Sequence, residues 1–360
     1  MQEILADVDA WQANGEAIAL ATVVAMRGSA PRLPGARLFV TRSGRMAGSV
    51  SGGCVESDVF ERAMQVLDRG APAMATYGIA DEVAFEVGLS CGGTIEVLIE
   101  PFVAEPAWQA VRSALEHQRP AALAVGLEPA ALLGRKLALL EGGADVGALD
   151  RELDADVAAA ARGLLPEGGT RVLSRAWHGV EARIFVEAFP PPSHLVIVGA
   201  THTAMALCRL AASLGFRVTV VDPRSAYATA ERFGAADAIL RTPPGEALDA
   251  LGLDGWSFVV VLTHDPKFDV PAVLHAVRAG ARYVGMMGSR RTLERRRVEL
   301  RAAGVSEAEL ARVRAPIGLD LGGRVPEEIA LAILAEVVAA RHGREGGPLS
   351  TAAGAIHGRT

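Results

Sequence analysis

The stretch HLVIVGATHTAMALCRLAASLGFRVTVVDPR, residues 194–224, decides the fold of the C-terminal half of the chain. An apolar run at 194–198 stops at Gly199, and a helix-forming segment at 204–214 stops at another glycine. A second apolar run follows at 216–221 and ends at an aspartate. Short strands that are apolar throughout and joined by a helix are typical of a parallel sheet with helices packed on both faces.

The same alternation continues toward the C-terminus. Further strands are expected at 238–240, 258–263 and 283–287, a helix at 270–279, and a last helix from Pro326 to about Gly343. Proline suits the first turn of a helix and glycine its end. We therefore predict an α/β protein in which residues 193–343 form a Rossmann-like, doubly wound parallel sheet.

Three consecutive prolines, residues 190–192, mark the clearest domain boundary, because proline disfavours helices and inner strands. Residues 1–102 mix helical and strand patterns and are predicted to form an N-terminal mixed α+β domain with glycine and cysteine loops. Residues 103–189 contain no chemically suggestive cluster and are interpreted as a middle α+β scaffold section. Residues 344–360 lack periodicity and are predicted to be a flexible tail.

Composition excludes several classes of protein. The 360 residues contain 36 basic and 42 acidic side chains, and a net charge of −6 argues against nucleic-acid binding, which requires neutralised phosphates. Only 3 cysteines are present, which excludes a disulfide framework and indicates a reducing compartment. No apolar run approaches the roughly 20 residues of a membrane-spanning helix. The N-terminus is acidic, unlike a signal peptide, so we expect a soluble cytoplasmic protein.

Glycine-rich loops carry the first candidate site. They span residues 27–32, 48–56 and 88–93, and the last two contain Cys54 and Cys91. Glycines gather where the backbone approaches a ligand or needs positive φ, and a cysteine at a helix N-terminus favours thiolate. Both residues are candidate thiolates, although the alternative is that they are small buried hydrophobes in tight turns. Cys208 is predicted to be a core residue, and the cysteine spacing does not indicate a zinc site.

The turn GATHTA, residues 199–204, follows a strand and opens a helix, as dinucleotide-binding turns do. Gly199, Thr201 and His202 are candidate ligand residues there, His202 alternatively being a cap or an ordinary surface histidine. Asp222 ends the second strand, where a ribose hydroxyl would bind, and Arg224 suits a 2′-phosphate. However, Thr201 replaces the glycine that lets the backbone reach a pyrophosphate. NAD(P) binding is therefore possible but not favoured.

A further candidate anion site is Ser289 with Arg290, in the stretch 285–291. Ser289 is predicted to cap the helix that begins at Arg290, and a helix N-terminus beside an arginine suits a phosphate or another oxyanion. Residues 295–297 are three more arginines, interpreted as a solvated helix face paired with nearby glutamates. The glycine-rich turn at 316–323 is expected to line the same crevice.

Taken together, these stretches resemble the XdhC/CoxI family of molybdenum-enzyme accessory proteins. The matching segments are GSAPR (28–32), GSVSGGCVE (48–56), GLSCGGTIEVLIEP (88–101), VIVGATHTA (196–204), VVDPR (220–224), THDPKFD (263–269), YVGMMGSRRT (283–292) and PIGLDLGGRVPEEIALAI (316–333). They occur in the family's order at both ends of the chain. Many members have Gly-Ala-Gly-His where this sequence has Gly-Ala-Thr-His.

The resemblance implies an accessory factor, a chaperone rather than an enzyme. Such a factor binds molybdenum cofactor (molybdopterin), supports its sulfuration and inserts it into a hydroxylase of the xanthine dehydrogenase, aldehyde oxidase or carbon monoxide dehydrogenase type. The implied partners are the apo molybdenum hydroxylase, a sulfur donor such as a cysteine desulfurase, and a second copy in a homodimer.

On this hypothesis Cys91 is a candidate molybdenum ligand and Cys54 a secondary one. The pterin phosphate would then lie in the doubly wound domain, beside Ser289 and Arg290. Two alternatives remain: an NAD(P)-dependent oxidoreductase that uses the Rossmann-like domain, and a persulfide carrier that binds no pterin.

Overall fold

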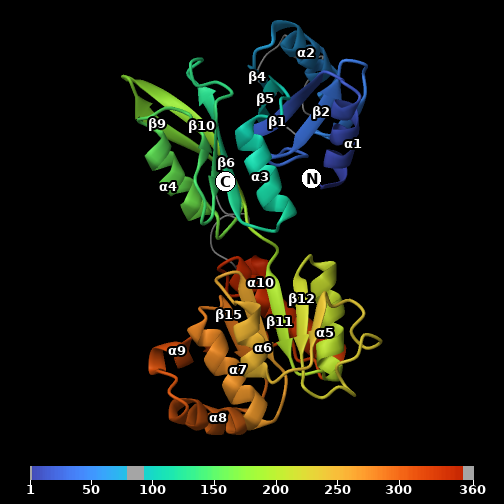
Figure 1. Cartoon of the computed structure of the whole chain (residues 1–360), viewed down its shortest axis with the longest axis vertical. Coiled ribbons are helices and arrows are strands. Elements are labelled where there is room, and N and C mark those ends of the chain that lie inside the picture. Colours follow the sequence, from blue (N-terminus) through green and yellow to red (C-terminus); the bar gives the residue numbers. More distant parts are fainter. Residues whose placement is uncertain (1, 79–92, 352–360) are drawn as a thin grey trace. The chain divides into compact units, whose positions relative to one another are not determined.

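The computed structural model describes residues 2–78 and 93–351 (Figure 1). The chain divides into two compact units between Pro190 and Pro191, inside the proline segment. Unit 1 contains both sections that precede the prolines, and unit 2 contains the doubly wound domain. The fold class is confirmed: unit 1 has antiparallel sheets, and unit 2 has a parallel sheet.

Unit 1 begins with an antiparallel sheet in the order β3-β2-β1-β5-β4. Its elements are α1 (Gln2–Ala13), β1 (Ile18–Arg27), β2 (Arg37–Thr41), β3 (Met46–Gly48), α2 (Glu56–Arg69), β4 (Ala73–Tyr77) and β5 (Thr94–Pro101). Helix α2 packs on this sheet through Val59, Ala63 and Val66, which recur at helical spacing and are fully or almost fully buried.

The second antiparallel sheet of unit 1 has the order β8-β7-β6-β10-β9. Its elements are α3 (Pro106–Glu116), β6 (Ala121–Glu128), β7 (Lys136–Leu140), β8 (Val146–Gly147), α4 (Asp154–Leu164), β9 (Gly169–Trp177) and β10 (Val180–Phe189).

Buried charges join the two sheets. Arg37 of β2 donates to Glu187 of β10, and Lys136 of β7 donates to Glu100 of β5 at 2.6 Å. All four side chains are largely excluded from water. Because a buried charge is costly without its partner, these pairs fix one section of unit 1 against the other.

Unit 2 contains a parallel six-stranded sheet in the order β13-β12-β11-β14-β15-β16. Its elements are β11 (His194–Val198), α5 (His202–Ser213), β12 (Arg217–Val221), β13 (Ala238–Leu240), α6 (Pro244–Leu251), β14 (Ser257–Val261), α7 (Pro266–Arg278), β15 (Tyr283–Met286), α8 (Arg290–Ala302), α9 (Glu307–Ala311), β16 (Val313–Arg314), α10 (Pro326–Arg341) and η1 (Leu349–Thr351). The reversal of strand order lies between β11 and β14.

Alternate residues of β11 enter cores on opposite faces of this sheet. Leu195 and Ile197 lie in the cluster that includes α5 and α10, whereas Val196 and Val198 lie in the cluster that includes α6 and α7. This double burial is the reason that the strands are apolar throughout. Helix α5 begins at His202, two residues earlier than expected, because Thr201 caps it.

Among residues 2–78 and 93–351, no helix is both long and apolar enough to cross a membrane.

Candidate functional sites

The glycine-rich loops of unit 1 meet, as far as they are described. Gly93 lies so close to the loop at 27–32 that a Cβ there would overlap the carbonyl oxygen of Ser29. A Cβ at Gly52, in the loop at 48–56, would lie 3.8 Å from Cβ of Pro31. The loop at 27–32 therefore contacts both other segments.

The loop at 48–56 is folded around the carboxylate of Glu56, the first residue of α2. The donors to this carboxylate are the hydroxyls of Ser49 and Ser51 and the backbone amides of Val50, Ser51, Gly52, Gly53 and Val55. Burial alone would raise the pKa of Glu56, but hydrogen bonds from Ser51, Ser49 and the loop amides outweigh burial and lower the pKa to about 2. Glu56 is therefore an anion that shapes the loop.

Glu56 is not among the residues that the sequence patterns indicated as candidates. A signal existed, because a glutamate in the first turn of a helix that follows serines and glycines is a typical partner for loop and helix N–H groups.

Cys54 lies on this ordered loop, two residues before α2 begins. Its backbone N–H donates to Oγ of Ser51 at 2.9 Å, and its side chain is half-buried against the core of the first sheet. Cys91 lies outside the described residues. Cys208 is confirmed as a core residue, because it is 1% exposed and burial raises its pKa to about 11.

In unit 2, the turn after β11 needs its first glycine and uses its threonine as a cap. Gly199 has φ of +107°, and a Cβ there would lie 2.5 Å from Cγ2 of Thr263. Thr201 accepts a hydrogen bond from the amide of Ala204 at 3.2 Å and so caps α5. His202 is the first residue of α5.

Asp222 and Arg224 bind each other. The Asp222 carboxylate is 1% exposed and accepts hydrogen bonds from the amide of Ala200 at 2.7 Å and from Nε and Nη2 of Arg224 at 2.9 and 2.6 Å. Burial alone would raise the pKa of Asp222, but Arg224 and the Ala200 amide together lower it. In this conformation the carboxylate is directed inward and is not available to a ribose hydroxyl.

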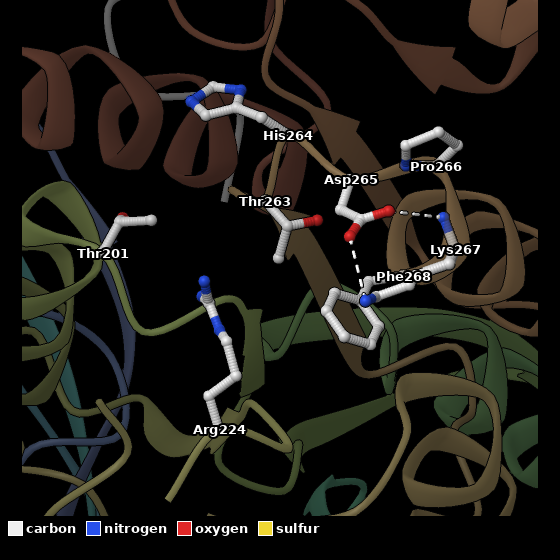
Figure 2. A pocket seen from close by; sticks show the side chains of 8 residues that line it. All are labelled: Thr201, Arg224, Thr263, His264, Asp265, Pro266, Lys267 and Phe268. Atoms are coloured by element: carbon white, nitrogen blue, oxygen red, sulfur yellow. Dashed lines mark hydrogen bonds and ion pairs between the residues drawn. The ribbon is translucent and has the colours of Figure 1, made fainter. Parts of the chain in front are cut away.

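A cleft of about 480 Å³ opens beside this pair (Figure 2). We call it the switch-point cleft, and its lining residues are Thr201, Arg224 and residues 263–268. These residues follow β11, β12 and β14, at the edge of the sheet where ligands of doubly wound proteins bind. Two of the sequence candidates, Thr201 and Arg224, therefore meet in one cavity.

A buried ion pair between Arg296 and Asp269 contacts two residues that line the cleft, Thr263 and His264. Its burial corrects one prediction. Arg296 of α8 donates to Asp269 of α7 at 2.8 Å and to the carbonyl oxygen of His264 at 3.1 Å, while Thr263 donates to the same aspartate. Arg296 is 5% exposed, so the prediction that it is solvated is wrong. It is spaced on α8 with Leu293 and Leu300, which also face the core.

The predicted pairing of this arginine run with Glu294 and Glu299 is confirmed for two of its members. Arg297 pairs with Glu294 at 3.4 Å, and Arg296 also binds Glu299, at 2.8 Å. Ser289 caps α8 by accepting a hydrogen bond from the Thr292 amide at 3.2 Å.

Ser289 and Arg290 are exposed and do not line the switch-point cleft, and neither do His202 or residues 316–323.

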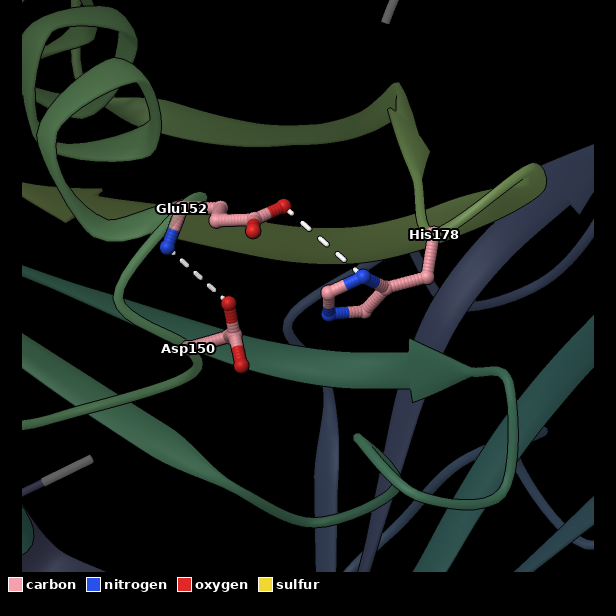
Figure 3. Close-up of side chains that lie close together, drawn as sticks. All are labelled: Asp150, Glu152 and His178. Carbon is pink, nitrogen blue, oxygen red and sulfur yellow. Dashed lines mark hydrogen bonds and ion pairs between the residues drawn. The ribbon is translucent and has the colours of Figure 1, made fainter.

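Asp150, Glu152 and His178 of unit 1 bring potential ligand atoms within 4.8 Å of one another (Figure 3). The His178 ring lies 3.9 Å from the Glu152 carboxylate, and Asp150 accepts the Glu152 amide at 2.9 Å. Glu152 and His178 are exposed. Because such surface groups are common without a metal, we assign this cluster no role.

Comparison with known proteins defines the class of protein. Residues 195–337 match the family model described as the XdhC Rossmann domain, and residues 11–78 match the model of the XdhC and CoxI family. The chain belongs to the XdhC/CoxI family.

Individual relatives extend over most of the chain. A Bacillus subtilis protein, named as a probable xanthine dehydrogenase component, is 28% identical over 338 residues, covering 93% of this chain and 96% of the relative. The molybdenum cofactor insertion chaperone PaoD of Escherichia coli is 27% identical over 328 residues, covering 91% of this chain and 85% of PaoD. The chain is thus a distant homologue of a cofactor insertion chaperone.

A crystal structure described as a xanthine dehydrogenase from Bacillus halodurans has the same fold. It aligns with a TM-score of 0.66 at 22% identity, covering 96% of this chain and 97% of that one.

Proposed function

We propose that the protein is an accessory factor that binds molybdenum cofactor as its cargo, supports sulfuration of the cargo and inserts it into an apo molybdenum hydroxylase. The recipient is of the xanthine dehydrogenase, aldehyde oxidase or carbon monoxide dehydrogenase type. Family membership and homology to an insertion chaperone support this proposal. The structural observation that carries it is Cys54, held on a loop that is shaped by Glu56 and contacts a second glycine loop.

The residues suit the chemistry of such a cargo. Thiolates are soft ligands, and a cysteine beside exposed glycines leaves room for a large ligand to approach. In this proposal Cys91 is the molybdenum ligand, Cys54 assists it, and unit 2 holds the phosphate end of the pterin. Ser289 and Arg290 are the candidates from the sequence for that end. A cysteine desulfurase or similar sulfur donor is the source of the sulfur, and the factor acts as a cytoplasmic homodimer.

Expression of the full chain in a molybdate-fed host tests the proposal. The purified protein should contain molybdenum and, after oxidation, a fluorescent pterin. Cys91→Ala and Cys54→Ala should lose most of both while keeping the wild-type circular dichroism spectrum. Cys208→Ala is the matched control, because this thiol is buried in the core of unit 2, and it should retain the cargo. Undiminished pterin in both loop variants contradicts the cysteine assignment.

The competing function, an NAD(P)-dependent oxidoreductase, is less well supported. The inward-facing Asp222 carboxylate and the Thr201 cap occupy the two positions that normally receive ribose and pyrophosphate. Fluorescence titration with NADH and NADPH separates the two functions. A persulfide carrier would use the same cysteines but would purify without pterin.

A further inference from the structure

We propose that the switch-point cleft of unit 2 binds a phosphate monoester and that Arg224 is its principal ligand. The inference deepens the proposed function, in which unit 2 holds the phosphate end of the pterin, and rests on that function where the pterin is the ligand. It also selects a position in unit 2 other than the helix start at Ser289, which is exposed and does not border the cleft.

The guanidinium group of Arg224 is fixed in one orientation by its neighbours. Asp222 binds two of its guanidinium nitrogens, and Asp222 is itself fixed by the Ala200 amide. The Tyr227 ring lies 4.6 Å from the guanidinium carbon and supports the group from one face. Among the described residues Nη1 of Arg224 donates no hydrogen bond, and Figure 2 shows the guanidinium tip directed into the cleft. An arginine fixed in this way loses little entropy when it binds an oxyanion.

The remaining lining groups suit a phosphate. The Asp265 carboxylate is committed to α7, because it accepts the Lys267 amide at 3.1 Å and pairs with the Lys267 ammonium group at 3.3 Å. The Lys267 side chain, which also lines the cleft, is 67% exposed. The acidic groups beside the cleft are thus paired locally, while Arg224 presents an unoccupied donor. Thr201 lies at the N-terminus of α5, where the backbone amides of the helix favour an anion.

The cleft favours a monoester over the pyrophosphate of a dinucleotide. Pyrophosphate binding needs close approach to the backbone at residue 201, where this chain has a capped threonine side chain. A phosphate monoester needs only the guanidinium nitrogens of Arg224 that face the cleft. Two sources present such a group: the phosphate arm of the pterin cargo, and the 2′-phosphate of a nucleotide such as NADPH.

Calorimetric titration of the full-length protein with inorganic phosphate tests the site itself. We expect saturable binding that Arg224→Gln weakens at least about tenfold, the usual effect of losing a charge-assisted hydrogen bond. Arg232→Gln is the matched control, because Arg232 stacks on the same Tyr227 ring at 5.7 Å but does not line the cleft. Arg290→Gln tests the α8 start. Both of these variants should bind phosphate like the wild type.

Arg224→Gln leaves the buried Asp222 without its cation. A second variant therefore separates loss of phosphate binding from a folding defect. Arg224→Lys keeps a positive charge but loses the planar fork, and it should also bind phosphate more weakly than the wild type. The proposal is overturned if the wild type shows no saturable phosphate binding. It is also overturned if both Arg224 variants bind as tightly as the wild type, or if Arg290→Gln alone weakens binding.

Two further measurements distinguish the sources. Preference for NADPH over NADH that disappears in Arg224→Gln identifies a nucleotide. Loss of co-purified pterin from Arg224→Gln, without any NADPH preference in the wild type, identifies the cargo. Wild-type protein that binds phosphate but purifies without pterin or molybdenum would refute the proposed function and leave the phosphate site intact.

Discussion

Replacing Glu56 by glutamine should loosen the cysteine-bearing loop. One carboxylate oxygen accepts Ser49 Oγ at 2.7 Å and the amide of Gly52 at 3.1 Å, and the other accepts the amides of Gly53 and Val55 at 2.9 and 3.2 Å. A glutamine side chain presents an NH₂ group at one of these two positions. Whichever orientation it takes, several loop donors then face another donor, and the surviving hydrogen bonds lose the assistance of the negative charge.

The size of the effect follows from the electrostatics of the loop. Lowering the Glu56 pKa from 4.5 to about 2 corresponds to roughly 3 kcal/mol of preference for the charged form. Gly52 and Gly53 are exposed, so water screens part of this interaction. We therefore expect Glu56→Gln to lower the free energy of unfolding by about 2 kcal/mol. For a unit of this size, that loss lowers the melting temperature of unit 1 by roughly 4–8 °C.

The sign of the pH dependence follows from the same shift. A carboxyl group with a lowered pKa stabilises the folded state fully above its unfolded pKa of 4.5, and this contribution disappears as the pH falls toward 2. The wild type should therefore lose its advantage over Glu56→Gln across that interval.

Differential scanning calorimetry measures the stability change, and mass spectrometry measures the alkylation rate of Cys54 by iodoacetamide. Cys54 should react faster in Glu56→Gln, because the half-buried thiol is no longer held by the loop. Glu61→Gln, on the exposed face of the same helix, is the control and should behave like the wild type. Equal melting temperatures and equal alkylation rates in Glu56→Gln and the wild type would refute the role of Glu56.

Two further predictions concern unit 2. Arg296→Ala leaves Asp269, which is 2% exposed, without its cation and should destabilise unit 2 by about 3–5 kcal/mol in urea unfolding, whereas Arg297→Ala should change stability by less than about 0.5 kcal/mol. Similar losses in both variants would contradict the buried-pair interpretation. Gly199→Ala forces a side chain into φ of +107° and against Thr263, so it should destabilise the unit by about 2 kcal/mol or more, and a wild-type urea midpoint would count against that strain.

The parts that the sequence predicted well depend on local patterns. Double burial makes every residue of β11 apolar, apart from His194 at its start, so the parallel sheet is visible in the sequence alone. Ser289 was predictable as a cap, because its partner Thr292 lies only three residues away. Cys208 was predictable as a core residue from its helical spacing.

The parts that were missed depend on partners far apart in the sequence. Arg296 reads as one of three adjacent arginines, and its burial depends on Asp269, which is 27 residues away. Arg37 and Glu187 are separated by 150 residues, so nothing local shows that the middle section of unit 1 carries a buried charge toward the first sheet. In both cases a charged side chain is expected to be exposed to solvent, and only the packing of neighbouring elements buries it.

The turn after β11 keeps the glycine that its backbone requires but differs from the dinucleotide pattern at its ligand positions. Gly199 serves the backbone, because the residues around Thr263 approach too closely for any side chain, and this requirement holds whatever ligand is bound. Thr201 and Asp222 occupy ligand positions of the dinucleotide pattern, but here one caps a helix and the other anchors Arg224. Neither residue is therefore placed as the dinucleotide pattern requires, and Arg224 is directed into the same cavity. In the phosphate-site proposal, the orientation that Asp222 gives to Arg224 is therefore the property that decides what this cavity binds.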